Sequence, residues 1–147
     1  MRRVYRLWRR DRGNALVEFV VLSVVLLLPS LYLVLTLGSV QSAVFAADII
    51  ARDAARIHAT EQDLELALQR SSEHARMVLE DSGLEGTDVV EISCSEDPCA
   101  TAGGTVVATV RIPVPVPGLG PVLGQDGPIA VSSGHSVQVD QYRAGNA

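Results

Sequence analysis

The sequence has few aromatic residues, no lysine and only two cysteines. Aromatic residues make up 4% of the 147 positions, so large side chains for a globular core are scarce. Two cysteines are too few for a disulfide-dense mini-protein, and glycine and proline are too infrequent for a collagen-like repeat. Hydrophobic residues still reach 48%, which excludes a disordered acidic chain. Many of them are concentrated at positions 19–37, and we therefore do not expect an ordinary soluble enzyme.

All basic residues are arginines, and half of them precede the apolar segment. The first 13 residues hold six of the twelve arginines and carry a formal charge of +5, whereas the chain from Phe19 onward carries −9. A basic arm could bind nucleic acid, but the acidic remainder would repel phosphates. The positive-inside rule explains the cluster better. It predicts that residues 1–13 are a cytoplasmic leader and that the C-terminal part is extracytoplasmic. We therefore expect the chain to associate with a membrane and not with nucleic acid.

Helical patterns occupy the first half of the chain. Residues 14–38 are apolar over a length that crosses a bilayer as a helix, with Pro29 inside. Residues 39–83 form the next predicted region, an extracytoplasmic amphipathic one with two apolar stripes at helical spacing. The second stripe follows a predicted helix start at Thr60 and ends at Gly83. The pattern fits both a continuous helix and a bend near residues 59–60.

The composition changes to a strand pattern in residues 84–147, which we expect to form a small β-sheet head. Three strands are predicted, at 88–94, 105–116 and 129–142, the last with a possible bulge at Gly134. The prolines from Pro113 onward place that end of the second strand at an edge or outside the sheet. The predicted fold class is α+β: a long membrane-spanning N-terminal helix that continues into an amphipathic helix, packed on a small antiparallel sheet.

The two cysteines flank a short turn, Cys94-Ser-Glu-Asp-Pro-Cys99. Because this turn lies on the predicted outer side, where disulfides persist, we expect Cys94 and Cys99 to be linked. Two free thiols or half of a metal site are the alternatives. A zinc site would need two more ligands, and the three histidines are scattered along the chain.

The sequence offers little that would support catalysis. Ser132, Ser133 and His135 are close in sequence, but neighbouring strand positions do not make a nucleophile and base with an orienting group. His58 and His74 have the spacing of a helix surface, so we expect them to be solvated. There is no phosphate loop, paired-histidine motif or glycine-rich cofactor turn. We therefore expect no catalytic residue, no cofactor and no metal.

Three interpretations of the N-terminal segment compete. A secretory signal peptide would be cut after Ala46. However, the apolar run is longer than that of a signal peptide and ends well before this cleavage site. A plain membrane anchor needs no acidic residue, yet Glu18 lies at the start of the membrane helix. Placing a carboxylate there, next to hydrocarbon, costs free energy. The third interpretation is cleavage after Gly13. The new amino group of Asn14 would lie one helical turn from Glu18. The Glu18 carboxylate would then compensate the positive charge of this amino group, either in the same chain or in a neighbouring chain.

At these residues the chain resembles the type IV pilin superfamily, whose precursors have a basic leader, a glycine before the cut and glutamate as the fifth mature residue. It is more closely similar to the TadE-like family, pilin-like subunits of tight-adherence (Flp-type) pili. The resemblance covers Arg12-Gly13, Val17-Glu18-Phe19, Leu28-Pro29, Leu37–Gln41, Ala51–Arg56, the proline-rich strand and the closing strand through Tyr142-Arg143.

The resemblance implies a minor pilin or pseudopilin that a prepilin peptidase cuts between Gly13 and Asn14. Its implied partners are that peptidase, the membrane platform of the secretion machine and other pilin-like subunits. Assembly would proceed through the N-terminal helix, with Glu18 as the assembly residue. The protein would be single-pass in a bacterial cell membrane, with a surface pilus as a further location of the mature chain. The alternative is an unprocessed single-pass envelope protein with an extracytoplasmic binding head.

Overall fold

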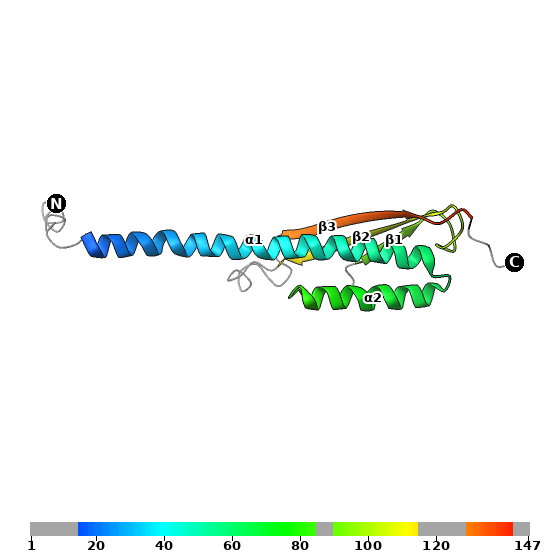
Figure 1. Cartoon of the computed structure of the whole chain (residues 1–147), viewed down its shortest axis with the longest axis horizontal. Coiled ribbons are helices and arrows are strands. Elements are labelled where there is room, and N and C mark those ends of the chain that lie inside the picture. Colours follow the sequence, from blue (N-terminus) through cyan, green and yellow to red (C-terminus); the bar gives the residue numbers. More distant parts are fainter. Residues whose placement is uncertain (1–14, 85–89, 115–128, 143–147) are drawn as a thin grey trace, which may run out of the picture. The chain divides into compact units, whose positions relative to one another are not determined.

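A computed structural model describes residues 15–84, 90–114 and 129–142 (Figure 1). Its contacts divide the chain into two compact units, Met1–Leu35 and Thr36–Ala147. Helix α1 (Ala15–Thr60) belongs to both units. The second unit also holds α2 (Leu64–Asp81) and the strands β1 (Val90–Cys94), β2 (Thr105–Val114) and β3 (Ile129–Gln138).

The structure confirms the α+β class predicted from the sequence. It contains a long apolar N-terminal helix and a three-stranded antiparallel sheet in the order β1-β2-β3. The described part of the apolar helix begins at Ala15, so Gly13 and Asn14 of the expected cleavage site lie outside the described residues. The loop expected at residues 118–127 also lies outside them.

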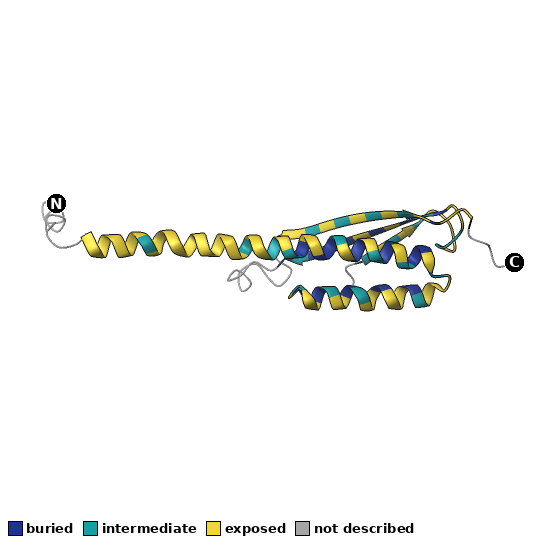
Figure 2. Cartoon of the chain, viewed as in Figure 1, coloured by how far each residue is buried: buried dark blue, intermediate teal, exposed yellow. Residues whose placement is uncertain are grey.

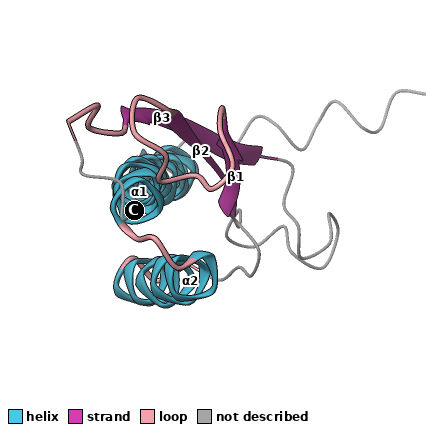
Figure 3. Ribbon diagram, turned by 90° about the vertical axis from the view of Figure 1, so that its right-hand side faces the viewer, coloured by secondary structure: helices cyan, strands magenta, loops and turns pink. Residues whose placement is uncertain are grey.

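In the second unit, α1 lies between α2 on one side and the sheet on the other (Figure 3). The buried face of α1 is built mostly from alanines, which allow the neighbouring elements to approach closely (Figure 2). The largest buried cluster combines residues of all three layers: Ala43, Ala46, Ala47, Ile50 and Ala51 of α1, Ala75 and Leu79 of α2, and Val110, Ile112 and Val114 of β2.

Helix α2 begins and ends at local capping motifs. Its N-cap is Asp63, whose carboxylate accepts hydrogen bonds from the N–H groups of Glu65 and Leu66 at 2.9 and 3.3 Å. The predicted start at Thr60 was wrong, because the Thr60 hydroxyl instead donates to the Arg56 carbonyl and closes α1. At the other end, Gly83 has a φ of +65°, and the Leu84 N–H donates to the Leu79 carbonyl. The break after Thr60 therefore separates two helices.

Strand β2 is the centre of the sheet. Its even-numbered residues face α1 and are fully or almost fully buried, while the odd-numbered ones alternate outward. The register between β2 and β3 runs without interruption from Thr105 opposite Gln138 to Val114 opposite Ile129. The bulge considered at Gly134 is therefore absent, and β3 ends at Gln138 rather than Tyr142.

Pro113 lies within β2, at a place where the described residues pair with the strand on one side only. Described pairing with β1 ends where Val90 lies opposite Val110, whereas pairing with β3 continues past Pro113. The local edge explains how a residue without an N–H is accommodated in the central strand.

Candidate functional site on the apolar helix

The first unit presents an apolar helix surface that nothing in the described chain covers. Leu16 is 75% exposed and Phe19 is 69% exposed, and the large apolar residues that follow up to Leu35 are also exposed. A contiguous apolar surface of this kind marks a membrane or protein contact. By length and composition, α1 is the one helix among the described residues that is long and apolar enough to cross a membrane.

The hydroxyl of Ser30, next to Pro29 in this helix, is satisfied by a local hydrogen bond. Helix α1 continues through Pro29, which lacks an N–H donor. The next residue, Ser30, donates its hydroxyl proton to the Leu26 carbonyl at 2.7 Å. Such back-bonding removes the need for water around the hydroxyl, so Ser30 is compatible with a hydrocarbon environment.

Glu18 is the acidic residue of this surface and lies in the first turn of α1. Its neighbours Val17 and Phe19 are exposed and apolar. A carboxylate in the first turn interacts favourably with the positive end of the helix dipole. No ion pair with another described residue is found for Glu18. Its position therefore leaves the carboxylate available to a positive group at the helix N-terminus or on a neighbouring chain.

The second unit buries one histidine that the sequence placed on the surface. His58 is 1% exposed, so the expectation that it is solvated was wrong. Its Nε2 lies 3.3 Å from the Ser71 hydroxyl, which itself donates to the Leu68 carbonyl at 3.1 Å. His58 Nε2–H is then the donor, and Nδ1 has no hydrogen-bond partner among the described residues. Desolvation by burial lowers the pKa of His58, so the neutral ring is favoured in the folded chain.

His74 is partly buried rather than freely solvated. Its Nε2 lies 2.9 Å from a carboxylate oxygen of Asp53, and the two side chains are 32% and 40% exposed. This contact joins α2 to α1, so it is an interhelical pair and not an isolated surface histidine. Exposed pairs of this kind contribute at most about 1 kcal/mol to folding.

Ser132, Ser133 and His135 are distributed over both faces of β3. Ser133 and His135 lie on the face of β3 that points to α1, because their partners in the register are the buried Val110 and Ala108. Ser132 lies on the other face. No hydrogen bond joins any two of these three side chains in the described structure.

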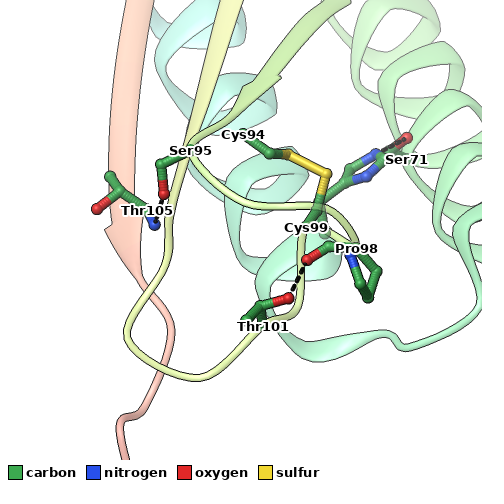
Figure 4. The surroundings of a disulfide bond; sticks show 8 residues. Ser71, Cys94, Ser95, Pro98, Cys99, Thr101 and Thr105 are labelled. Atoms are coloured by element: carbon green, nitrogen blue, oxygen red, sulfur yellow. Dashed lines mark hydrogen bonds between the residues drawn. A yellow bond between two sulfur atoms is a disulfide. The ribbon is translucent and has the colours of Figure 1, made fainter.

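The turn between β1 and β2 is closed by a Cys94–Cys99 disulfide, with the two Cα atoms 5.2 Å apart (Figure 4). The Ser95 hydroxyl accepts a hydrogen bond from the Thr105 N–H at 2.9 Å, and the Thr101 hydroxyl donates to the Pro98 carbonyl at 2.6 Å. Both sulfurs are consumed in this bond. In the described ranges, no cluster of three or more histidine, cysteine, aspartate or glutamate residues could hold a metal ion.

An open pocket that the sequence did not indicate lies between the end of α1 and the end of β3. It is lined by Arg56, Ala59, Thr60, Val137, Gln138, Val139 and Asp140. One guanidinium and one carboxylate offset each other in formal charge.

Comparison with known proteins identified no relative of this chain. No family model, no curated protein and no solved structure matches the chain.

Proposed function

We propose that this chain is a minor pilin-like or pseudopilin-like subunit of the TadE type, held in a bacterial cell membrane by the apolar part of α1. The observation that carries the proposal is Glu18, a carboxylate in the first turn of an exposed apolar helix. A plain anchor does not require an acid at this position, and moving a carboxylate toward hydrocarbon costs free energy. A compensating amine at Asn14, created by cleavage after Gly13, gives Glu18 a role.

In this proposal the mature helix packs with the helices of other pilin-like subunits on the membrane platform of the secretion machine. The prepilin peptidase supplies the catalytic groups, and the chain is its substrate. The head in the second unit lies outside the cell, where the Cys94–Cys99 bond persists. The arginine-rich leader stays in the cytoplasm until it is removed.

Substitution of Gly13 by leucine tests processing. We expect Gly13→Leu to block maturation, because a peptidase pocket that accepts a residue without a side chain would clash with an isobutyl group. The precursor would retain its six leader arginines, and N-terminal sequencing of the membrane-purified variant would read from Met1 or Arg2. Wild-type protein should begin at Asn14. Wild-type and variant chains that both retain the leader would contradict cleavage.

A second candidate is an unprocessed single-pass envelope protein with an extracytoplasmic binding head. The position of Glu18 in the first turn favours it, since the helix dipole alone gives a carboxylate there a favourable interaction. N-terminal sequencing separates the two candidates directly, because an unprocessed protein keeps its leader.

A further inference from the structure

The exposed surface of α1 in the second unit changes from apolar to charged along the helix. Phe45 is 69% exposed, and Val44 and Ile49 are 46% and 44% exposed. Beyond Ile49, α1 exposes no large apolar side chain, and the next exposed residues are Arg52 and Arg56. We call Val44, Phe45 and Ile49 the Phe45 patch. Exposed apolar groups that adjoin each other in this way call for a contact outside the chain.

The Phe45 patch lies at the end of a long part of α1 that has no charge. After Glu18, the next charged residue of the helix is Asp48, so residues 19–47 carry none. A helix of this length spans about 43 Å. The hydrocarbon core of a bilayer is about 30 Å thick, and the bilayer with both headgroup layers is about 40–45 Å thick. The charge-free length therefore matches the whole bilayer and exceeds its hydrocarbon core.

The level of the patch can also be counted from Glu18, which lies in the first turn of the helix. With Glu18 at the inner edge of the hydrocarbon, α1 has to cross about 30 Å and then one headgroup layer of about 5–7 Å. At 1.5 Å per residue and the average tilt of about 20°, this takes about 25–27 residues. The outer surface of the headgroup layer is then reached where Val44 and Phe45 lie.

The direction of helical side chains brings the patch closer to the lipid. Side chains of an α-helix lean toward its N-terminus and cover the turn that precedes their own Cα. In α1 this is the direction of the membrane segment. The Phe45 ring therefore extends toward the bilayer, whereas a residue with the opposite lean would extend into water.

The sheet adds an apolar side chain at the same level. Ile129, the first residue of β3, is 39% exposed. It lies opposite Val114, which belongs to the buried cluster that contains Ala43. The start of β3 is therefore next to the part of α1 that carries the Phe45 patch.

The spread of the patch around α1 favours lipid over a partner helix as its cover. Helical periodicity places Val44 and Ile49 about 140° apart around the helix axis. A partner helix contacts a stripe of residues three or four positions apart, and these two residues do not share such a stripe. A lipid surface surrounds every side of α1 that α2 and the sheet leave open, so it can contact both.

We propose that the outer headgroup layer of the membrane covers the Phe45 patch, so that the second unit rests on the lipid surface. The inference rests on the membrane anchoring of the proposed function, but not on cleavage or assembly. Asp48 is then the first charged residue outside the lipid, where it pairs with Arg52 at 2.8 Å. Phe45 holds α1 at this depth, because its ring loses contact with lipid when the helix moves outward.

Tryptophan fluorescence in vesicles tests the depth of the patch. The chain has one tryptophan, so Trp8→Phe removes the background signal. In this background, Phe45→Trp, Ile49→Trp and Arg56→Trp place the probe at three levels along the exposed part of α1. Each full chain is reconstituted into vesicles of phosphatidylcholine and phosphatidylglycerol, with and without a lipid that carries a nitroxide on its headgroup.

We expect the nitroxide to quench Phe45→Trp at least about twofold more than Arg56→Trp, because Arg56 lies about 16 Å further along the helix. Ile49→Trp should be intermediate, and acrylamide, which quenches from water, should give the reverse order. Leu68→Trp is the matched control: Leu68 is also apolar and 46% exposed, but it lies on α2, which follows the far end of α1. It should be quenched like Arg56→Trp. Far-UV circular dichroism checks that each variant is folded.

Vesicle flotation separates a failure of this inference from a failure of the proposed function. A chain that does not float with the vesicles would overturn membrane anchoring and the inference together. A chain that floats but shows equal nitroxide quenching in Phe45→Trp and Arg56→Trp would overturn the inference alone. Shielding of Phe45→Trp from both quenchers would also overturn it, because a protein would then cover the patch.

Discussion

Helix α1 carries a carboxylate near its start and an imidazole near its end, and these two residues have opposite surroundings. Glu18 is exposed among apolar side chains, and His58 is enclosed by the layers of the second unit. The exposed apolar face around Glu18 and the burial of His58 both depart from the usual distribution, in which exposed faces are polar and buried positions are apolar. Glu18 therefore points to a contact outside the chain, whereas His58 affects the stability of the second unit itself.

His58 should make the stability of the second unit depend on pH. Burial lowers the pKa of His58 in the folded chain, so below the ordinary histidine pKa the unfolded chain binds more protons. Its contribution is fully present above that value and is lost as the pH falls through it. We expect the midpoint of chemical denaturation, followed by circular dichroism, to decrease from pH 7.5 to pH 5.

His58→Gln should reduce this decrease, since glutamine binds no proton in this range and can still donate to Ser71. His135→Gln is the matched control and should leave the decrease in place. An equal decrease in wild type and His58→Gln would assign the effect to other groups.

At the scale of elements, the alanine face of α1 sets the distance between the layers. Ala47 is fully buried in the cluster that joins α1, α2 and β2. We expect Ala47→Leu to lower the free energy of unfolding by about 1–3 kcal/mol, because a packed interior has no room for three more carbons. Denaturant titration measures the change.

Gln41→Leu provides the matched control for this prediction. It adds an apolar side chain to an exposed position of the same helix, where the effect should stay within about 0.5 kcal/mol. Equal stability of Ala47→Leu and wild type would mean that the layers separate easily and that α1 is not tightly held.

The turn between β1 and β2 should depend on its disulfide. Closing so short a loop contributes about 2 kcal/mol in the chain-entropy model. We expect the double variant Cys94→Ser, Cys99→Ser to lose about that much in urea titration. Thiol labelling of surface-exposed native protein without reductant should find neither cysteine reactive. Two freely alkylated cysteines would contradict both the bond and an extracytoplasmic head.

Local patterns predicted the elements well and their ends less well. The strand pattern at 105–116 predicted β2, which begins at the expected Thr105, and the long apolar run predicted the first part of α1. The start of α2 was predicted at Thr60 because the acidic residues Glu61 to Asp63 follow it like a first helical turn, whereas in the structure Asp63 is itself the N-cap. His58 was misjudged because its burial depends on α2 packing over it, which the periodicity of α1 alone does not show.

At the scale of the whole molecule, the two units differ in composition and in the surroundings that their surfaces require. The first exposes apolar side chains and needs hydrocarbon or other helices around it, whereas the second buries its own core and carries the acidic surface. Within the first unit the sequence already marked Glu18 as exceptional, because a single carboxylate in an apolar run is visible without a structure. The strand order β1-β2-β3 was not visible, since it depends on long-range pairing.

Glu18→Gln distinguishes an assembly role from a tolerated charge. We expect this variant to insert into the membrane and to be cleaved normally, because removing the carboxylate makes the helix easier to transfer into lipid. Assembly should fail, because the amine of Asn14 on a neighbouring subunit would face a low-dielectric helix bundle without its counter-charge. Breaking such a buried pair costs about 3–5 kcal/mol.

The measurement is crosslinking of mature Glu18→Gln protein to the other pilus subunits, together with a piliation assay. Glu18→Asp is the matched control: it keeps the charge on a side chain one carbon shorter and should retain part of the assembly that glutamine loses. A pair within one chain, near the membrane surface, would be worth at most about 1 kcal/mol and would leave assembly intact. Normal partner recovery and normal piliation by Glu18→Gln would therefore reduce Glu18 to an interfacial charge favoured by the helix dipole, and the unprocessed anchor would become the better account of the chain.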